Sequence, residues 1–140
     1  KSFKKVHGIM EDGRKNEDGL IALVPSSEKL CDEDGKEYVA YAVNVKLTDG
    51  EMWTLMKRYS EFERLYKVLM EQYNFQMLAQ FSFPKKDLFF SGADDVIEKR
   101  RKAFSEFCQL LPLLAPRPPE VAEFLRLPPG AAAAAAAAAA

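Results

Sequence analysis

The chain has 140 residues, of which 48% are hydrophobic and 29% charged, and its formal net charge is −1. This composition suits a globular domain, its charge argues against nucleic-acid binding, and no apolar run reaches the roughly 18 residues of a membrane span. Cys31 and Cys108 are too few for a disulfide framework, so we expect a reducing, cytoplasmic setting. The last ten residues are all alanine, and we interpret 128–140 as an artefactual tail behind one domain.

Residues 1–19 are polar and are expected to be a lead-in to the first strand. That strand is predicted at 20–24, where Pro25 would end it. Alternating apolar residues predict a second strand at 38–47, followed by a hairpin turn at Thr48-Asp49-Gly50 and a third strand at 52–58. The first half of the domain should therefore be an antiparallel meander.

Helices are predicted in the second half of the chain. Ser60 and Glu63 form a capping-box pattern, and the apolar stripe behind it is Phe62, Leu65, Tyr66, Leu69 and Tyr73. Residues 74–93 lack periodicity and are predicted to be a long functional loop. Asp94 or Asp95 should cap the next helix, whose stripe is Ile97, Phe104, Phe107, Cys108 and Leu111, and a last helix is expected at 120–127. The predicted fold class is α+β, a three-stranded antiparallel β-meander packed against a helical subdomain.

Motifs for catalysis are missing from the sequence. The only histidine, His7, lies in the polar lead-in, the cysteines lack C-x-x-C spacing, and no glycine-rich phosphate-binding motif occurs. The carboxylate pairs lie in polar runs with nothing to raise a pKa. We therefore expect no enzymatic activity, no metal and no cofactor.

Basic residues form three clusters, 57–58, 85–86 and 99–102, which either converge on one anion or form separate solvated surfaces. Arg100 falls on or beside the apolar stripe of its helix, so it should be paired, open into a polar pocket, or reach out to water. Arg58 stands before Tyr59 at a strand–helix junction. Its planar fork suits a phosphate, although pairing with Glu61 is the alternative.

The segment around Lys85 and Lys86 continues into Leu88, Phe89 and Phe90. Lysines beside an apolar tip are typical of a loop that contacts a membrane, because the bases meet headgroups and the apolar side chains enter the interface. The alternative is a loop folded back, with Phe89 and Phe90 both in the core, and we expect at least one of the two to be there.

These features occur together in one known family. The stretch W-T-L-M-K-R-Y-S-E-F at 53–62 resembles the signature of PX (Phox-homology) domains. F-P-K-K at 83–86 resembles the proline–lysine loop of that family, and V-I-E-K-R-R-K-A-F at 96–104 is similar to its second-helix motif. The resemblance covers residues 20–127, and the segment 34–41 also resembles sorting nexins that carry an RGS domain beside the PX domain.

The resemblance implies a role for each basic feature. Arg58 would bind the 3-phosphate of a phosphoinositide, Tyr59 would pack against the inositol ring, and Arg100 would hydrogen-bond the 4- and 5-hydroxyls. Lys86 would hold the 1-phosphate, and Leu88 and Phe89 would enter the bilayer. The family loop carries a proline where this chain has Phe81, so Lys85 could take the place of Lys86.

The function expected from this resemblance is membrane targeting by recognition of phosphatidylinositol 3-phosphate, as a cytoplasmic protein peripheral on endosomal membranes. Its partner would be a phosphoinositide-containing membrane, with protein partners reached through the parent protein and no nucleic acid. The alternative is a PX fold that binds proteins, with weak or no lipid binding. P-R-P-P at 116–119 is a minimal SH3-ligand pattern or simply a connection between helices.

Overall fold

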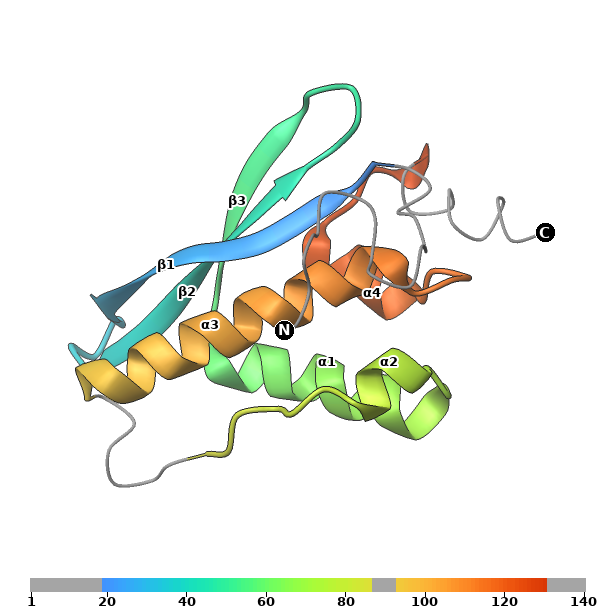
Figure 1. The fold of residues 1–140 in the computed structure, drawn as a ribbon. Coiled ribbons are helices and arrows are strands. Elements are labelled where there is room, and N and C mark those ends of the chain that lie inside the picture. Colours follow the sequence, from blue (N-terminus) through green and yellow to red (C-terminus); the bar gives the residue numbers. More distant parts are fainter. Residues whose placement is uncertain (1–18, 87–92, 131–140) are drawn as a thin grey trace.

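The computed structural model describes residues 19–86 and 93–130. Its three strands form one antiparallel sheet in the order β1-β2-β3, and the helices gather on one side of that sheet (Figure 1). The predicted α+β class, with a meander packed against helices, is confirmed. The elements are β1 (Ile21–Cys31), β2 (Glu37–Lys46), β3 (Met52–Lys57), α1 (Tyr59–Gln72), α2 (Gln76–Ala79), α3 (Asp94–Leu110), the 3₁₀ turn η1 (Leu111–Leu113) and α4 (Pro119–Leu125). None of the helices in the described residues is long and apolar enough to span a membrane.

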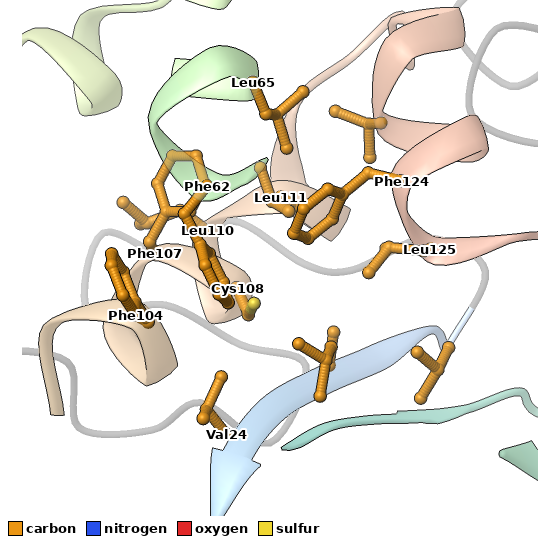
Figure 2. Close-up of a cluster of buried hydrophobic side chains, with 14 of the residues drawn as sticks. Val24, Phe62, Leu65, Phe104, Phe107, Cys108, Leu110, Leu111, Phe124 and Leu125 are labelled. Carbon is orange, nitrogen blue, oxygen red and sulfur yellow. The ribbon is translucent and has the colours of Figure 1, made fainter. Parts of the chain in front are cut away.

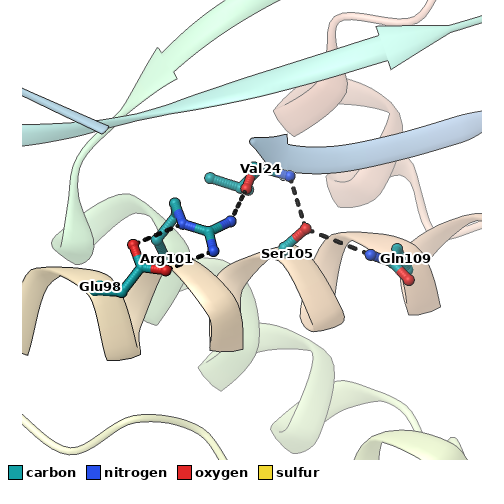
Figure 3. A network of polar contacts seen from close by, with 5 residues as sticks. All are labelled: Val24, Glu98, Arg101, Ser105 and Gln109. Carbon is teal, nitrogen blue, oxygen red and sulfur yellow. Dashed lines mark hydrogen bonds and ion pairs between the residues drawn. The ribbon is translucent and has the colours of Figure 1, made fainter. Parts of the chain in front are cut away.

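Strand β1 runs past Pro25, so the prediction that this proline ends the strand was wrong. Pairing with β2 is interrupted at a bulge and resumes at Ser26, and the bulge tolerates a residue without an N–H. Helix α3 supplies partners there, because the Val24 N–H donates to Ser105 Oγ at 3.0 Å and Arg101 Nη1 donates to the Val24 carbonyl at 2.8 Å (Figure 3). Side chains of α3 thus hold the strand against the helix.

The β2–β3 connection has the predicted tight turn. Gly50 has a φ of 94°, which favours glycine, and its N–H donates to the Leu47 carbonyl at 2.9 Å. Asp49 accepts a hydrogen bond from the Glu51 N–H at 2.9 Å. The turn fixes the register in which Tyr41 pairs with Lys57 at the far end of the hairpin.

Helix α1 begins directly after β3, with Arg58 as its N-cap in extended conformation. The Glu61 carboxylate accepts a hydrogen bond from the Arg58 backbone N–H at 2.9 Å. The predicted capping box of Ser60 and Glu63 was therefore wrong. The helix starts two residues earlier than that pattern implies, which makes Glu61 the residue that can reach back to the cap.

The other helix starts also differ slightly from prediction. Asp94 and Asp95 lie in the first turn of α3, behind Ala93 as N-cap, where their charges favour the helix dipole. Helix α4 begins at Pro119, in the position that proline prefers. The short helix α2 was not predicted, because a single turn is too short to show a period.

The core lies between the sheet and the helices. Its apolar side chains come from the inner face of β2 and from the stripes of α1 and α3, and the Phe62 and Phe104 rings stack with centroids 3.9 Å apart (Figure 2). The stripe predicted for α3 is buried in full, which confirms the helical spacing. Cys108 is buried and Cys31 exposed, and both are free; burial raises the pKa of the Cys108 thiol.

Candidate functional site

Tyr59 lies where the predicted basic segments meet. It is the first residue of α1, directly after Arg58. Its hydroxyl donates a hydrogen bond to the Pro84 carbonyl at 2.7 Å, and the guanidinium carbon of Arg100 lies 4.3 Å from its ring centroid. Burial raises the pKa of Tyr59, so the phenol keeps the proton that it donates. One aromatic ring therefore joins the β3–α1 junction, the residues before Lys85, and helix α3.

Arg100 is buried inside this arrangement. It is 6% exposed, and its Nε and Nη2 atoms have no hydrogen-bond partner among the described residues. The Tyr41 hydroxyl is likewise buried and makes no hydrogen bond of ordinary geometry. Burial raises the pKa of Tyr41, and the charge of Arg100 and its weak contact with the hydroxyl partly offset that rise. A guanidinium withdrawn from water without partners costs stability. The interpretation in which Arg100 reaches out to water is therefore wrong, and its free donors suit a polar or anionic ligand.

Arg58 is exposed at the end of β3. Its guanidinium carbon lies 4.2 Å from the ring centroid of Tyr38 on β2. Glu61 binds the Arg58 backbone N–H rather than its guanidinium, and within the described ranges no carboxylate forms an ion pair with Arg58. The alternative pairing of Arg58 with Glu61 is thus not observed. A guanidinium stacked on a ring keeps its in-plane N–H groups available for a phosphate.

Lys57 does not share the surroundings of Arg58. It is 9% exposed, its Nζ lies 4.6 Å from the Phe124 ring centroid, and Glu61 Oε2 is 3.9 Å away. Burial lowers the pKa of Lys57, while Glu61 acts in the opposite direction. The basic cluster at 57–58 therefore contributes one residue to the site, because consecutive side chains of a strand point to opposite faces.

The basic side chains at 99–102 also point in different directions, because they lie on different faces of helix α3. Arg100 points toward Tyr59, whereas Arg101 holds Glu98 at 2.7 Å and the Val24 carbonyl of the sheet (Figure 3). Lys99 and Lys102 are exposed. Helical geometry thus selects Arg100 alone from a run of four basic residues.

Two aromatic residues fix the segment that precedes Lys85 and Lys86. The Phe83 ring stacks on Tyr66 with centroids 4.7 Å apart, and the Phe81 ring lies 5.5 Å from that of Phe107. Phe81 therefore serves as an apolar anchor. Both lysines that follow are exposed, and the choice between them stays a prediction.

The predicted membrane-entering residues, Leu88 and Phe89, lie outside the described residues, as does Phe90. The sequence did not reveal two tyrosines that also belong to the candidate site. Tyr41 was predicted only as a core residue, and Tyr38 only as the start of a strand. Strand alternation identifies their faces, but it does not show which distant arginine each one meets.

No group of three or more His, Cys, Asp or Glu residues in ranges 19–86 and 93–130 could hold a metal ion. The candidate site that these ranges form combines the buried guanidinium donors of Arg100, the exposed guanidinium of Arg58, and the side chains of Tyr38, Tyr41 and Tyr59. Such a donor set can bind a ligand that carries both phosphate and hydroxyl groups.

Comparisons with known proteins agree with this arrangement. The family model described as PX domain matches residues 45–127. Human sorting nexin-13 is 34% identical over 90 residues, which are 62% of this chain and 9% of that protein. Mouse sorting nexin-21 is 33% identical over 115 residues, which are 78% of this chain and 31% of that protein. The chain thus spans less than a third of either relative.

A likeness to solved structures extends the comparison to the fold. The X-ray structure of a designed CISK-PX domain superposes with a TM-score of 0.58 at 28% identity. The superposition covers 75% of this chain and 97% of that one. Nearly the whole of that structure therefore has a counterpart here.

Proposed function

The chain belongs to the PX domain family, and we propose that it recognises phosphatidylinositol 3-phosphate and thereby docks on endosomal membranes. Membership of this family, with sorting nexins among the relatives, supports phosphoinositide-binding membrane targeting. The choice of lipid, the endosomal location and the peripheral, cytoplasmic setting are parts of the proposal. So are the domain limits of 20–127, which are supported by the burial of Leu20 and the packing of Leu127 against the core.

The observation that carries the proposal is that Tyr59, which follows Arg58 directly in the chain, contacts both Arg100 and the segment before Lys85. Arg58 would bind the 3-phosphate through its fork, and the unpartnered donors of Arg100 would bind the ring hydroxyls. The half-buried Tyr59 ring would pack against the inositol. Lys86, or Lys85 in its place, would hold the 1-phosphate that links the headgroup to the lipid.

A protein-binding PX fold with weak or no lipid binding is the other candidate. An SH3 domain would read the P-R-P-P segment only if its side chains were accessible. Pro116 and Pro119 are exposed, but Arg117 between them is 5% exposed and Pro118 is buried, so the segment is only partly accessible and nothing else favours that use of it. The proposal also includes protein partners of the parent protein, among them those of an RGS domain beside this one. Only the sequence resemblance to sorting nexins supports this part.

Sedimentation with phosphatidylcholine vesicles, plain or carrying one phosphoinositide at a time, tests the proposal. We expect binding to vesicles with phosphatidylinositol 3-phosphate and its loss in Arg58→Ala, because removing one partner of a charge pair costs about 2–5 kcal/mol. Lys46→Ala is the matched control, since Lys46 is exposed at the opposite end of β2.

Two results would contradict different parts of the proposal. Near-wild-type binding by a folded Arg58→Ala variant would remove Arg58 from the site. Tighter binding to a bis-phosphorylated lipid would change the ligand while keeping the site.

A further inference from the structure

We infer that Tyr38 is a positioning residue of the headgroup site, which holds the Arg58 guanidinium in the orientation that meets the phosphate. The inference rests on the proposed function and deepens it. It starts from the contact in which the guanidinium carbon of Arg58 lies 4.2 Å from the ring centroid of Tyr38.

The sheet register explains why these two residues meet although twenty positions separate them. Strand β3 ends at Lys57, whose partner on β2 is Tyr41. Tyr38 therefore lies on β2 beyond the last residue that pairs with β3, at the same end of the hairpin as Arg58. It also lies on the face of β2 opposite to Val39 and Tyr41, which pack against the core. Its half-buried ring thus forms a platform next to the point where the chain enters α1.

A rigid turn fixes the backbone on which Tyr38 is mounted. Asp32 Oδ1 accepts hydrogen bonds from the Asp34 and Lys36 N–H groups, both at 2.9 Å, and the Asp32 N–H donates to the Lys36 carbonyl at 2.9 Å. Strand β2 begins at Glu37, and Tyr38 then pairs with Leu30 of β1. The β1–β2 hairpin is therefore coupled to Arg58 through the Tyr38 side chain.

Stacking and phosphate binding use different parts of a guanidinium. The ring of Tyr38 covers one face of the group, whereas the N–H donors of the fork point outward in its plane. An exposed arginine without such a platform samples many rotamers and has to be ordered when the ligand binds. Tyr38 should therefore raise affinity by ordering Arg58 beforehand, without touching the ligand.

Calorimetry with soluble inositol 1,3-bisphosphate, the headgroup of phosphatidylinositol 3-phosphate, tests this inference. We expect Tyr38→Leu to weaken binding about three- to tenfold, from the lost cation–π contact and the ordering of one arginine. Tyr38→Phe should retain wild-type affinity, because the phenyl ring still offers its face. The matched control is Tyr73→Leu, since the Tyr73 hydroxyl bonds Glu120 at the far end of α1. Equal losses in the leucine and phenylalanine variants would overturn the inference.

A double-mutant cycle separates positioning from direct contact. Lysine has no planar fork to orient, so in an Arg58→Lys background the further change Tyr38→Leu should cost much less than it does in the wild type. An undiminished loss there would mean that Tyr38 touches the ligand or supports the fold, and the inference would fail.

A readout without ligand keeps the inference distinct from the proposed function. In the wild type, the Arg58 side-chain protons should show an upfield NMR shift from the Tyr38 ring current, which Tyr38→Phe keeps and Tyr38→Leu removes. If the wild type binds neither vesicles nor the soluble headgroup, the proposed function fails, and the positioning role fails with it. If the headgroup binds and the Arg58 resonances are the same in all three proteins, only the inference about Tyr38 is wrong.

Discussion

Replacing Arg100 by methionine should stabilise the unliganded domain while it abolishes headgroup binding. The side chain is 6% exposed, and its Nε and Nη2 atoms are buried without partners. Methionine has a similar length, no polar donors and enough flexibility to fill the same space between Tyr59 and Tyr41. The substitution therefore removes a cost to folding and, in the same step, the donors that the ligand would use.

The magnitude follows from two opposing contributions. An unsatisfied buried donor costs about 1–3 kcal/mol. The contact between Arg100 and the Tyr59 ring returns about 0.5–2 kcal/mol. Two unsatisfied nitrogen atoms together cost about 2–6 kcal/mol, so after the ring contact is subtracted we expect a net gain of about 3 kcal/mol on removal. Each kcal/mol corresponds to about 4 °C of melting temperature in a domain of this size.

Arg101→Met is a matched control, because the neighbouring residue has the opposite environment. Arg101 donates to the Val24 carbonyl at 2.8 Å and holds Glu98 through two hydrogen bonds of 3.0 and 2.7 Å (Figure 3). Its loss should destabilise the domain by about 1–2 kcal/mol, mostly through the unpaired carbonyl, since the ion pair is partly exposed. Headgroup binding should persist, because Arg101 faces the sheet rather than Tyr59.

Thermal melts without ligand and calorimetry with inositol 1,3-bisphosphate measure both quantities for both variants. The expected pattern is crossed: Arg100→Met is more stable and does not bind, whereas Arg101→Met is less stable and binds. A lower melting temperature for Arg100→Met would refute the reasoning, since Arg100 would then support the fold. Lost binding in a folded Arg101→Met variant would also contradict it.

Three further predictions concern the lysine loop and the core. Replacing Leu88 and Phe89 together by alanine should lower affinity for vesicles with phosphatidylinositol 3-phosphate by about tenfold, because apolar burial worth roughly 1.5–3 kcal/mol per side chain is only partly realised at the interface. Sedimentation should detect that loss and calorimetry with the soluble headgroup should not; parallel losses would exclude insertion. Lys86→Ala should weaken soluble-headgroup binding more than Lys85→Ala, and the reverse order would assign the 1-phosphate to Lys85. Burial raises the pKa of Cys108 above its ordinary 9.0, so the folded protein keeps a proton that the unfolded chain releases. The contribution of Cys108 to the free energy of unfolding should be full below pH 9.0 and should fall as the pH rises above it. Denaturant titrations at several pH values should show a smaller fall in the free energy of unfolding for Cys108→Ala than for the wild type. The same pH dependence in both proteins would mean that Cys108 does not cause the fall.

Sequence periodicity predicted the elements that have a long, regular pattern. The stripe of α3 is buried as its spacing indicates, and Arg100 lies on it where the helical wheel puts it. In the stripe of α1, Phe62, Leu65 and Leu69 are buried, whereas Tyr66 and Tyr73 are only partly buried. The resemblance to PX domains then supplied a reason for a charge in that position. Local patterns were less informative where the chain departs from regular geometry, as at the bulge that carries Pro25 and at the single turn of α2.

Contacts between distant residues could not be predicted in this way. The stacking of Arg58 on Tyr38 depends on the register of β2 and β3, and the buried position of Lys57 depends on α4 packing above it. A basic cluster in the sequence does not show which of its members points toward the site. In the pairs 57–58 and 100–101, neighbouring side chains point in different directions because of strand and helix geometry. One member of each pair, Lys57 or Arg101, makes structural contacts, and the other member lies at the candidate site.

The central claim is that Arg58 and Arg100 bind one phosphoinositide headgroup around Tyr59. An NMR titration of the wild-type domain with inositol 1,3-bisphosphate tests it most directly, by following the side-chain Nε–Hε resonances of its arginines. The account predicts that the signals of Arg58 and Arg100 shift together along one saturable curve, while that of Arg101 stays in place. Shifts that leave Arg100 unchanged, or that follow separate curves for the two site arginines, would contradict a shared headgroup site.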